Sequence, residues 1–323
     1  MKKVLITGGA GFIGGNFVHY ILKKYPDYKI VNLDALTYAG NLATCQPIQK
    51  HTNYKFVKCD ITNRKSIFEL FEQEKFDAVV NLAAESHVDR SIKNPGIFIK
   101  TNVLGTQILM DASIKFNVRR YHQVSTDEVY GSLPLECPDL SFTEEATLNP
   151  SSPYSASKAS ADLLALSYYK TYNLPLTISR CSNNYGPYQL PEKLIPLIVS
   201  KALKDEHLPI YGKGNNIRDW LHVWDHCVAI DLILHKGRIG EIYNVSGQNQ
   251  RTNLEVVRTI LNNLKKPESL ITYVKDRPGH DLRYAINSRK LQEGLRWKPT
   301  YNFDLGIKHT IQWYLKNKEW WQT

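Results

Sequence analysis

Four side chains of this sequence have types and spacings that suit proton and hydride transfer. Two adjacent carboxylic acids, Asp127 and Glu128, precede Tyr154 and Lys158, which are four residues apart and so share one face of a helix. A phenol with a pKa of about 10 acts as a base at neutral pH only when nearby positive charge stabilises its phenolate. Lys158 and an oxidised nicotinamide ring are suitable sources of that charge. The pair therefore predicts oxidation of an alcohol by a nicotinamide cofactor, with an ordinary surface helix pair as the alternative.

The acid pair is not needed for alcohol oxidation, so it predicts a second step on the same substrate. An acid beside a base can remove water next to a newly formed ketone. Two close carboxyl groups push their pKa values apart, which makes one shared proton a natural arrangement. The spacing leaves open whether Asp127 or Glu128 holds that proton. The alternative is that one acid caps a helix or pairs with an arginine. The preceding Ser125 and Thr126 can donate a hydrogen bond to the same alcohol.

A glycine-rich loop, Thr7–Gly14, follows a short apolar segment at the start of the chain. Gly8 and Gly11 allow a tight turn and the close approach of a pyrophosphate, and Gly14 allows the next helix to pack on the strand. Asp34 follows about 20 residues later, where a carboxylate binds ribose hydroxyls and repels a 2′-phosphate. The loop therefore predicts an NAD site rather than an NADP site, with a plain glycine turn as the alternative.

Residues at the ends of other expected strands are candidates for the same cofactor. Asp60 and Ile61 follow the third strand, where an adenine would lie, although Asp60 could instead cap the next helix. Ala83 and Ala84 place small side chains where a cofactor must pass closely. Thr101 is either a cap or a cofactor contact.

Apolar β-branched segments alternate with helical patterns in the first half of the chain, which predicts βαβ units and a parallel sheet. The expected strands are Lys3–Thr7, Ile30–Leu33, Tyr54–Lys58, Ala78–Leu82, Tyr121–Ser125 and Leu176–Arg180. The expected helices are Phe12–Lys24, Lys65–Glu74, Phe98–Phe116 and Ser155–Tyr172. This order predicts the α/β class, with a Rossmann-like, doubly wound parallel sheet.

The alternation stops after Arg180. Asn183–Pro187 has residues typical of a turn, and irregular segments are expected as far as Trp220. A helix over Asp225–His235 and a strand over Ile242–Val245 would return to the sheet. We therefore expect an NAD-binding domain of residues 1–182, joined by 223–248, and a smaller C-terminal lobe of residues 183–222 and 249–323.

The composition argues against several function classes. The 323 residues are 42% hydrophobic and 22% charged, and no apolar run approaches the ~20 residues that span a bilayer. The net charge of +10 is spread without a basic run, which argues against nucleic-acid binding and suits a pyrophosphate-bearing substrate. Five scattered cysteines without a C-x-x-C pair argue against disulfides and a metal site. We expect a cytoplasmic protein with no nucleic-acid, membrane or metal partner.

Given these motifs, the sequence resembles the extended short-chain dehydrogenase/reductases, and among them the dTDP-glucose 4,6-dehydratases. The likeness extends from Lys3 to Trp321. It rests on the segments Thr7–Gly14, Asp34–Asn41, Asn81–Ser91, Ser125–Gly131, Tyr154–Lys158, Arg180–Gln189, Arg218–Val223 and Asp276–Asp281. The blocks Thr126–Glu128 and Ala84–Asp89 are specific to this subfamily, whereas the other motifs are shared more widely.

The resemblance implies conversion of dTDP-glucose to dTDP-4-keto-6-deoxyglucose, a lyase reaction of dTDP-rhamnose and other deoxysugar biosynthesis. Tyr154 would take the C4 hydroxyl proton while a hydride passes to NAD. Glu128 would then remove the C5 proton, and Asp127 would protonate the C6 hydroxyl as water leaves. The hydride would return to C6 while C5 is reprotonated, so NAD would stay tightly bound and be regenerated in each turnover. Thr126 and Lys158 complete the implied catalytic set.

The resemblance also implies sets of binding residues. The cofactor set is Gly8, Gly11, Phe12, Ile13, Gly14, Asp34, Leu36, Thr37, Asp60, Ile61, Leu82, Ala83, Ala84, Ser86, Thr101, Tyr154, Lys158 and Asn184. The substrate set is Ser86, Thr126, Asp127, Glu128, Asn183, Lys193, Leu194, Tyr211, Arg218, Asn253, Arg277 and His280. Members of this family pair as homodimers through the helices that carry Tyr154 and Phe98–Phe116, and we expect the same here.

Three residues of the implied substrate set could have structural roles instead. Arg218 and Arg277 suit a diphosphate because guanidinium forks match phosphate oxygens. Each arginine has an adjacent acid, Asp219 or Asp276, with which it could form a structural ion pair. Tyr211 would stack on a pyrimidine or belong to the core.

Related activities are kept as alternatives: a UDP-sugar 4,6-dehydratase, a 4-epimerase or a UDP-glucuronate decarboxylase. An epimerase reverses its own hydride transfer and a decarboxylase loses carbon dioxide from C5, so neither needs the pair Asp127 and Glu128. A non-catalytic NAD-binding regulator is a remote alternative, because the reactive side chains are all present. The residues alone do not distinguish thymine from uracil, or glucose from an N-acetyl sugar. The resemblance alone favours dTDP-glucose.

Overall fold

The computed structural model describes residues 1–321. Its centre is a seven-stranded sheet in the order β10-β6-β5-β4-β1-β2-β3, and every neighbouring pair is parallel. These strands are β1 (Lys3–Thr7), β2 (Lys29–Asp34), β3 (Tyr54–Lys58), β4 (Ala78–Asn81), β5 (Arg120–Thr126), β6 (Leu176–Cys181) and β10 (Ile242–Val245). The strand order reverses between β1 and β4, which is where a doubly wound sheet binds its ligand. The predicted fold class is confirmed.

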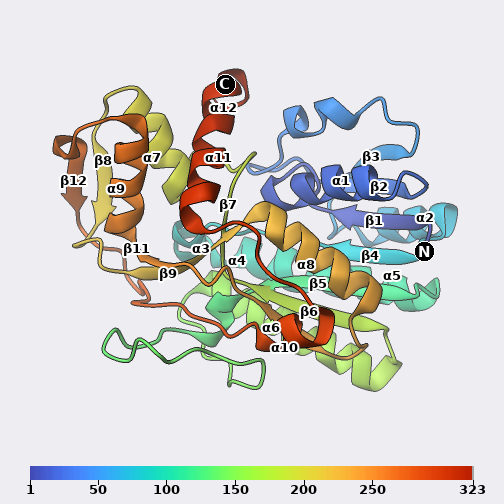
Figure 1. Ribbon diagram of the computed structural model, residues 1–323. Coiled ribbons are helices and arrows are strands. Elements are labelled where there is room, and N and C mark those ends of the chain that lie inside the picture. Colours follow the sequence, from blue (N-terminus) through green and yellow to red (C-terminus); the bar gives the residue numbers. More distant parts are fainter. Residues whose placement is uncertain (322–323) are drawn as a thin grey trace.

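Helices cover both faces of this sheet (Figure 1). Leu5 of β1 points into a core with the helices of one face, and its neighbours Val4 and Ile6 point into the core of the other face. The first face is covered by α2 (Arg64–Glu74), α5 (Thr106–Lys115) and α6 (Pro153–Tyr172), and the second by α1 (Phe12–Lys24) and α8 (Val223–Lys236). Burial on both faces explains why the strands read as continuous apolar runs.

The predicted helix Phe98–Phe116 is not one regular helix. The chain forms α3 (Val88–Lys93) and α4 (Pro95–Phe98), then a π-helix, η3 (Ile99–Gly105), before α5 begins. A Cβ atom at Gly105 would lie 2.5 Å from Cδ1 of Ile61. The wider π-helical turn therefore sits where the helix packs directly against the loop after β3.

The prediction of irregular structure between residues 183 and 220 is wrong. This stretch contains β7 (Asn183–Tyr185), α7 (Leu194–Leu203), β8 (Leu208–Tyr211) and β9 (Ile217–His222). Pro196 is the third residue of α7, where the backbone needs no N–H donor inside the helix, so the proline does not prevent a helix. β7 pairs with β9, and only Gly186 and the residues after it form the expected turn.

Two small sheets and several helices form the C-terminal part of the chain, whose outer end, with α7 and β8, lies on the left in Figure 1. β9 also pairs with β11 (Gln250–Thr252), and β8 pairs with β12 (Ile271–Val274). The helices are α9 (Asn253–Leu264), α10 (Arg289–Leu295), α11 (Phe303–Lys316) and α12 (Lys318–Trp321). Ile198 of α7, Val257 of α9 and Ile307 of α11 share one apolar core, which is separate from the cores on the central sheet.

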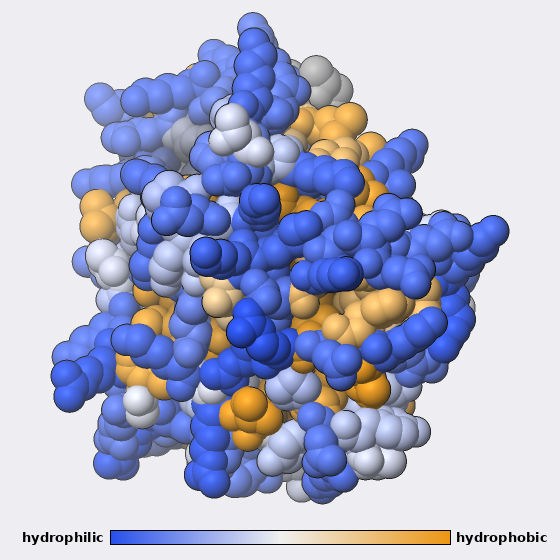
Figure 2. Space-filling view, turned by 90° about the vertical axis from the view of Figure 1, so that its right-hand side faces the viewer, coloured by the Kyte–Doolittle hydropathy of each residue, from blue (hydrophilic) through white to orange (hydrophobic). Residues whose placement is uncertain are grey.

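The predicted return to the sheet is confirmed, because β10 pairs with β6 and α8 packs against α1. The division into two domains at the predicted boundaries stays a prediction. Among residues 1–321 no helix is both long and apolar enough to cross a membrane. On the face shown in Figure 2, hydrophilic side chains cover most of the surface and apolar ones occur in separate patches.

Candidate active site

A large cavity lies at the carboxyl ends of the strands of the central sheet. Its wall contains the glycine loop, the ends of β2, β4, β5 and β6, the start of α6 and the segment before α7. The wall includes every residue of the predicted cofactor set except Leu36, and it includes Ser86, Thr126, Asp127, Glu128, Asn183 and Lys193 of the predicted substrate set. Residues far apart in the sequence therefore meet in one place, as the strand order requires.

The glycine loop leaves the first backbone N–H groups of α1 available. Its N-cap residue, Gly11, makes no side-chain cap bond to the helix. Gly8 has a φ of 71°, and a Cβ atom there would lie 2.8 Å from the backbone nitrogen of Ala83. Free N–H groups at a helix start and a close backbone approach are what a pyrophosphate needs. These residues therefore fit a dinucleotide, and a plain turn does not explain them.

Asp34, at the end of β2, lies in the cavity wall together with Thr37. Its carboxylate accepts hydrogen bonds from the backbone nitrogens of Ala10, at 3.0 Å, and Leu36, at 2.8 Å. Burial raises the pKa of this carboxyl group, and the two N–H donors oppose that shift. Leu36 itself has a φ of 54° and is absent from the wall in the described structure. Its predicted cofactor contact stays a prediction.

Asp60 does not cap the helix that follows it. The N-cap of α2 is Asn63, whose side chain accepts from the backbone nitrogen of Ser66. Asp60 instead accepts from the backbone nitrogen of Thr62 at 2.8 Å. It lies in the cavity wall together with Ile61, on the side where the sequence predicts the adenine. Thr101, inside η3, lines the same cavity and caps no helix.

Tyr154 and Lys158 lie in the first turns of α6, which is fixed by a capping box of Ser152 and Ser155. Both side chains are buried, but no hydrogen bond joins them anywhere in residues 1–321. The Lys158 ammonium donates to the carbonyl oxygen of Val124 at 2.6 Å. Tyr154 and Lys158 therefore share one face of α6, but the Tyr154 hydroxyl and the Lys158 ammonium have different partners.

The protein alone does not make Tyr154 a base. Burial raises the pKa of Tyr154 well above its usual value, and the nearby charge of Glu128 adds to this shift, whereas a hydrogen bond from Thr126 opposes it. Burial also lowers the pKa of Lys158, which the charge of Asp162 partly offsets. A phenol in these surroundings needs a further positive charge before it can lose its proton.

The acid pair follows β5 directly, in the short 3-10 helix η4 (Asp127–Tyr130). Thr126 is the cap of this turn, and its hydroxyl oxygen accepts from the Glu128 nitrogen at 3.3 Å. Asp127 is only 2% exposed, and its Oδ2 atom has no hydrogen-bond partner among the residues described. Within that part of the chain neither acid caps a helix or forms an ion pair. Both structural alternatives for the acid pair are therefore wrong.

Asp127 and Glu128 have different electrostatic surroundings. Burial raises the pKa of Asp127 well above its usual value, and the charge of Glu128 raises it further. Burial also raises the pKa of Glu128, but the positive charges of Arg218, Lys193 and Arg277 oppose this shift. Burial and the surrounding charges therefore favour protonation of Asp127 over protonation of Glu128.

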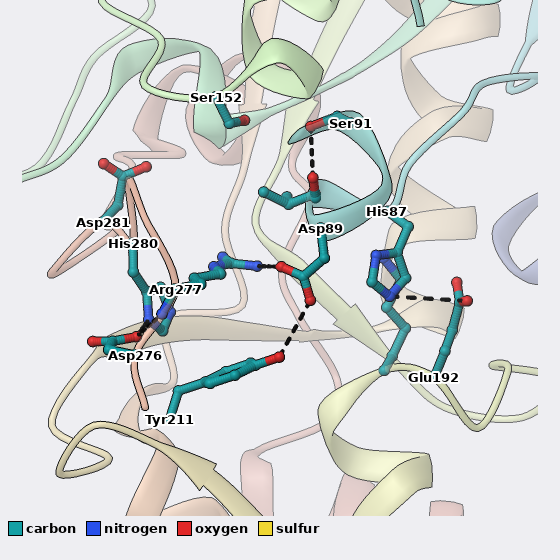
Figure 3. A network of polar contacts seen from close by, with 12 residues as sticks. His87, Asp89, Ser91, Ser152, Glu192, Tyr211, Asp276, Arg277, His280 and Asp281 are labelled. Carbon is teal, nitrogen blue, oxygen red and sulfur yellow. Dashed lines mark hydrogen bonds and ion pairs between the residues drawn. The ribbon is translucent and has the colours of Figure 1, made fainter. Parts of the chain in front are cut away.

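The remaining residues of the predicted substrate set, Leu194, Tyr211, Arg218, Asn253, Arg277 and His280, are outside the cavity wall. Several of them gather around Asp89 (Figure 3). NH1 of Arg277 lies 3.3 Å from Oδ1 of Asp89, and the Tyr211 hydroxyl lies 3.3 Å from Oδ2 of the same residue. The His280 ring packs edge-on against Tyr211, with 6.1 Å between ring centres. Leu194 and Asn253 are the first residues of α7 and α9.

Neither arginine pairs with the acid next to it in the sequence. The Arg218 guanidinium lies 4.3 Å from the ring centre of Tyr284 and donates to the carbonyl oxygen of Asp281 at 3.0 Å. Arg277 pairs with Asp89, and its Nε atom has no hydrogen-bond partner in the described chain. Tyr211 is 41% exposed, so it is not a core residue. An ion pair with the adjacent acid and a core position for the tyrosine are therefore both ruled out.

Sequence reasoning did not name Glu85, which lies in the cavity wall between two predicted cofactor residues. Its side chain is 3% exposed, and its Oε2 atom has no partner among residues 1–321. The side chain of Asn102 holds its backbone by accepting from its nitrogen at 2.9 Å and donating to its oxygen at 3.0 Å. The sequence signal for this residue was an acid that follows two alanines shortly after β4.

The family model for GDP-mannose 4,6 dehydratase matches residues 5–310 of this chain. A dTDP-glucose 4,6-dehydratase of Escherichia coli is 48% identical to it over 346 residues, which cover 99% of this chain and 95% of the relative. The chain belongs to the dTDP-glucose 4,6-dehydratase family.

Solved structures of this dehydratase family have the same fold over the whole chain. A dTDP-glucose 4,6-dehydratase of Bacillus anthracis, in complex with NAD, is 54% identical with a TM-score of 0.93, covering 100% of this chain and 99% of that one. A dTDP-glucose 4,6-dehydratase of Streptomyces venezuelae, also with NAD bound, is 45% identical with a TM-score of 0.95, and 99% of each chain is covered. The predicted family and fold are thus confirmed.

Proposed function

We propose that this chain dehydrates dTDP-glucose to dTDP-4-keto-6-deoxyglucose with a bound NAD. The observation that carries this proposal is that the acid pair and the tyrosine face one cavity. Asp127, Glu128 and Tyr154 come from η4 and α6, and the glycine loop and Asp34 lie in the same wall. Dehydratases with NAD bound are among the most similar solved structures.

When bound, NAD supplies the acceptor and later the donor of a hydride. Tyr154 takes the proton of the C4 hydroxyl, and Thr126 orients that hydroxyl. The positive charge of a bound oxidised nicotinamide would add to that of Lys158 and supply the stabilisation that the buried phenol lacks in the protein alone. The base step therefore depends on the loaded cavity, and Tyr154 remains a phenol without it.

The acid pair carries the step that distinguishes a dehydratase from other sugar oxidoreductases. A C4 ketone makes the C5 hydrogen acidic, and Glu128, whose ionised form the surrounding cations favour against the effect of burial, removes it. Asp127, which keeps its proton because it is buried beside Glu128, donates that proton to the departing C6 hydroxyl. A 4-epimerase or a decarboxylase has no use for this arrangement.

The positively charged side chains near the acid pair suit the diphosphate of the substrate. Arg218, Arg277 and Lys193 each act on Glu128 electrostatically, so all three lie near the acid pair. Arg277 also has an unpartnered Nε atom in the described chain. We assign the diphosphate to Arg218 and Arg277, and the pyrimidine to the exposed ring of Tyr211, which His280 contacts, with Asn253 as a further proposed substrate residue. Lys193 and Leu194, at the start of α7, would border the sugar.

The assembly we propose is a cytoplasmic homodimer in which each chain has an NAD-binding domain of residues 1–182 and 223–248 and a sugar-nucleotide lobe of residues 183–222 and 249–323. Exposed apolar side chains on η3 and α6 support the dimer. Ile99 is 51% exposed, Leu104 44% and Leu163 58%. η3 packs directly against α6, so these side chains belong to one pair of neighbouring helices. Covering them with a second copy would remove them from water.

The function is tested by incubating the purified protein with dTDP-glucose or UDP-glucose and weighing the products by mass spectrometry. We expect loss of one water molecule from dTDP-glucose without added NAD, because the cofactor is regenerated in each turnover. Faster conversion of UDP-glucose would overturn the choice of nucleotide. A product with the mass of the substrate and inverted C4 stereochemistry would show an epimerase.

A further inference from the structure

Arg180 is a buried arginine on β6 that no step of the proposed reaction uses. Its side chain is among the largest that are fully enclosed, at 2% exposure. Nε donates to Oδ2 of Asp162 at 2.9 Å, and NH1 lies 2.9 Å from the hydroxyl oxygen of Tyr130. The guanidinium also lies 4.9 Å from the ring centre of Tyr130. The two arms of one planar group are thus fixed to two different residues.

These two residues belong to the two elements that carry the reactive groups. Asp162 lies on α6, one turn after Lys158 and two turns after Tyr154. Tyr130 is the last residue of η4, the turn that begins with Asp127 and Glu128. Arg180 therefore connects the helix of the oxidising pair to the turn of the acid pair.

The connection is anchored in the sheet itself. Arg180 is paired in register with Ser125 of β5 on one side and with Asn244 of β10 on the other. The Tyr130 hydroxyl, which accepts from Arg180, donates to Oδ1 of Asn244 at 2.8 Å. Three adjacent strands thus fix the position of a turn that has only four residues.

Stability alone is a poor reason for this arrangement. A buried ion pair loses much of its Coulombic gain to desolvation, and apolar residues of similar volume often serve equally well. The planar guanidinium instead sets the direction of two bonds at once. On the basis of the function proposed above, we propose that Arg180 and Tyr130 are positioning residues that hold the acid pair in register with Tyr154 during the elimination step.

Tyr130→Phe tests this role, because it removes only the hydroxyl that joins η4 to Arg180 and Asn244. The Arg180–Asp162 pair and the ring packing remain, so α6 should stay in place. We expect C4 oxidation to change little and elimination to slow on the order of tenfold, since small misplacements of reacting groups cost factors of this size or more. Reduced nicotinamide, followed by its absorbance, should then accumulate on the enzyme during turnover.

Tyr121→Phe is the matched control. Tyr121 is also fully buried, but it lies on β5 and its hydroxyl donates to Gln123 at 3.4 Å, away from η4. The thermal unfolding midpoints of both variants show whether either one has merely lost stability. Arg180→Lys keeps the charge beside Asp162 but loses the planar fork, so it should also slow elimination while leaving C4 oxidation little changed. The double variant should eliminate water no more slowly than either single variant.

The inference holds if Tyr130→Phe accumulates reduced nicotinamide while Tyr121→Phe behaves as the wild type. It is overturned if Tyr130→Phe and Tyr121→Phe both have the wild-type ratio of oxidation rate to elimination rate. It is also overturned if Tyr130→Phe slows oxidation and elimination equally. A wild-type protein that fails to dehydrate dTDP-glucose would instead refute the proposed function, so the two failures are distinct.

Discussion

Asp127 and Glu128 are consecutive carboxyl groups whose pKa values are both raised by burial but to different extents. The Asp127 carboxyl group is buried beside Glu128 and lacks a partner for Oδ2 in the described chain, whereas three cations act on Glu128. In the proposed reaction, η4 thus presents the acid and the base on two consecutive residues. Each carboxyl group then has one role in that reaction, the acid on Asp127 and the base on Glu128.

The elimination step should have a bell-shaped pH dependence. Glu128 must be ionised, so the rate should fall as pH falls through its raised pKa. Asp127 must be protonated, so the rate should fall as pH rises through its own more strongly raised pKa. The measurement is kcat for water loss across the pH range. If the residual activity of Asp127→Asn kept the same alkaline limb, that limb would not belong to Asp127.

Replacing the phenol should stop the reaction before any water is lost. Tyr154→Phe removes the only proton acceptor assigned to the C4 hydroxyl, and general-base groups typically contribute about 10²–10⁴-fold. We expect neither reduced nicotinamide nor product in a single turnover, although the protein should still copurify with NAD. Substantial formation of reduced nicotinamide by this variant would mean that another group takes the C4 proton.

Arg277 should contribute to substrate binding more than to chemistry. Its guanidinium lies 3.3 Å from the Asp89 carboxylate, and its Nε atom has no hydrogen-bond partner in the described chain. A diphosphate would therefore replace Asp89 as the partner of the guanidinium and also accept from Nε. Arg277→Ala should raise KM by about tenfold or more with little change in kcat, and Arg277→Lys should restore only part of the loss because it lacks the fork. Arg289→Ala, at an exposed position on α10, is the control and should change neither constant. A fall in kcat alone would place Arg277 in the chemical step.

The glycine loop gives a prediction about stability and cofactor content together. Gly8→Ala puts a Cβ atom 2.8 Å from the Ala83 nitrogen at a φ of 71°, so it should destabilise the fold by about 1–3 kcal/mol and release NAD. Gly294→Ala, with no atom within 4 Å of the new Cβ in α10, should keep NAD and gain up to about 1 kcal/mol. Urea denaturation and the NAD content of the purified variants give both values. Normal NAD content in Gly8→Ala would contradict the assigned pyrophosphate position.

The central sheet could be predicted well from the sequence because its strands are buried on both faces. Apolar runs such as the predicted strand Ala78–Leu82 located each strand to within one residue of its observed bounds, here Ala78–Asn81. The same reasoning failed for Leu194–Leu203, because a proline in an apolar run looks like a break when its position in the first helical turn is unknown. The short strand Asn183–Tyr185 forms only through its pairing with β9, which is not visible in local sequence.

For the candidate site, sequence patterns located the residues but not their partners. The loop predicted an NAD site and the Tyr154–Lys158 spacing predicted an oxidising pair, and both sets of residues line one cavity in the structure. The pairing of Arg277 with Asp89, and the attachment of Lys158 to the Val124 carbonyl, join residues from different elements. Such contacts depend on how the chain folds back on itself, so no local pattern could reveal them.

A single-turnover experiment on Asp127→Asn with dTDP-glucose tests the division of roles within the acid pair. Formation and decay of the reduced nicotinamide signal are followed together with the mass of the sugar nucleotide. We expect oxidation at C4 to proceed nearly as in the wild type while water loss slows by about 10²-fold or more, leaving reduced nicotinamide trapped on the enzyme. Equal slowing of both steps, or water loss at the wild-type rate, would contradict the role of Asp127 as the acid that releases the C6 hydroxyl.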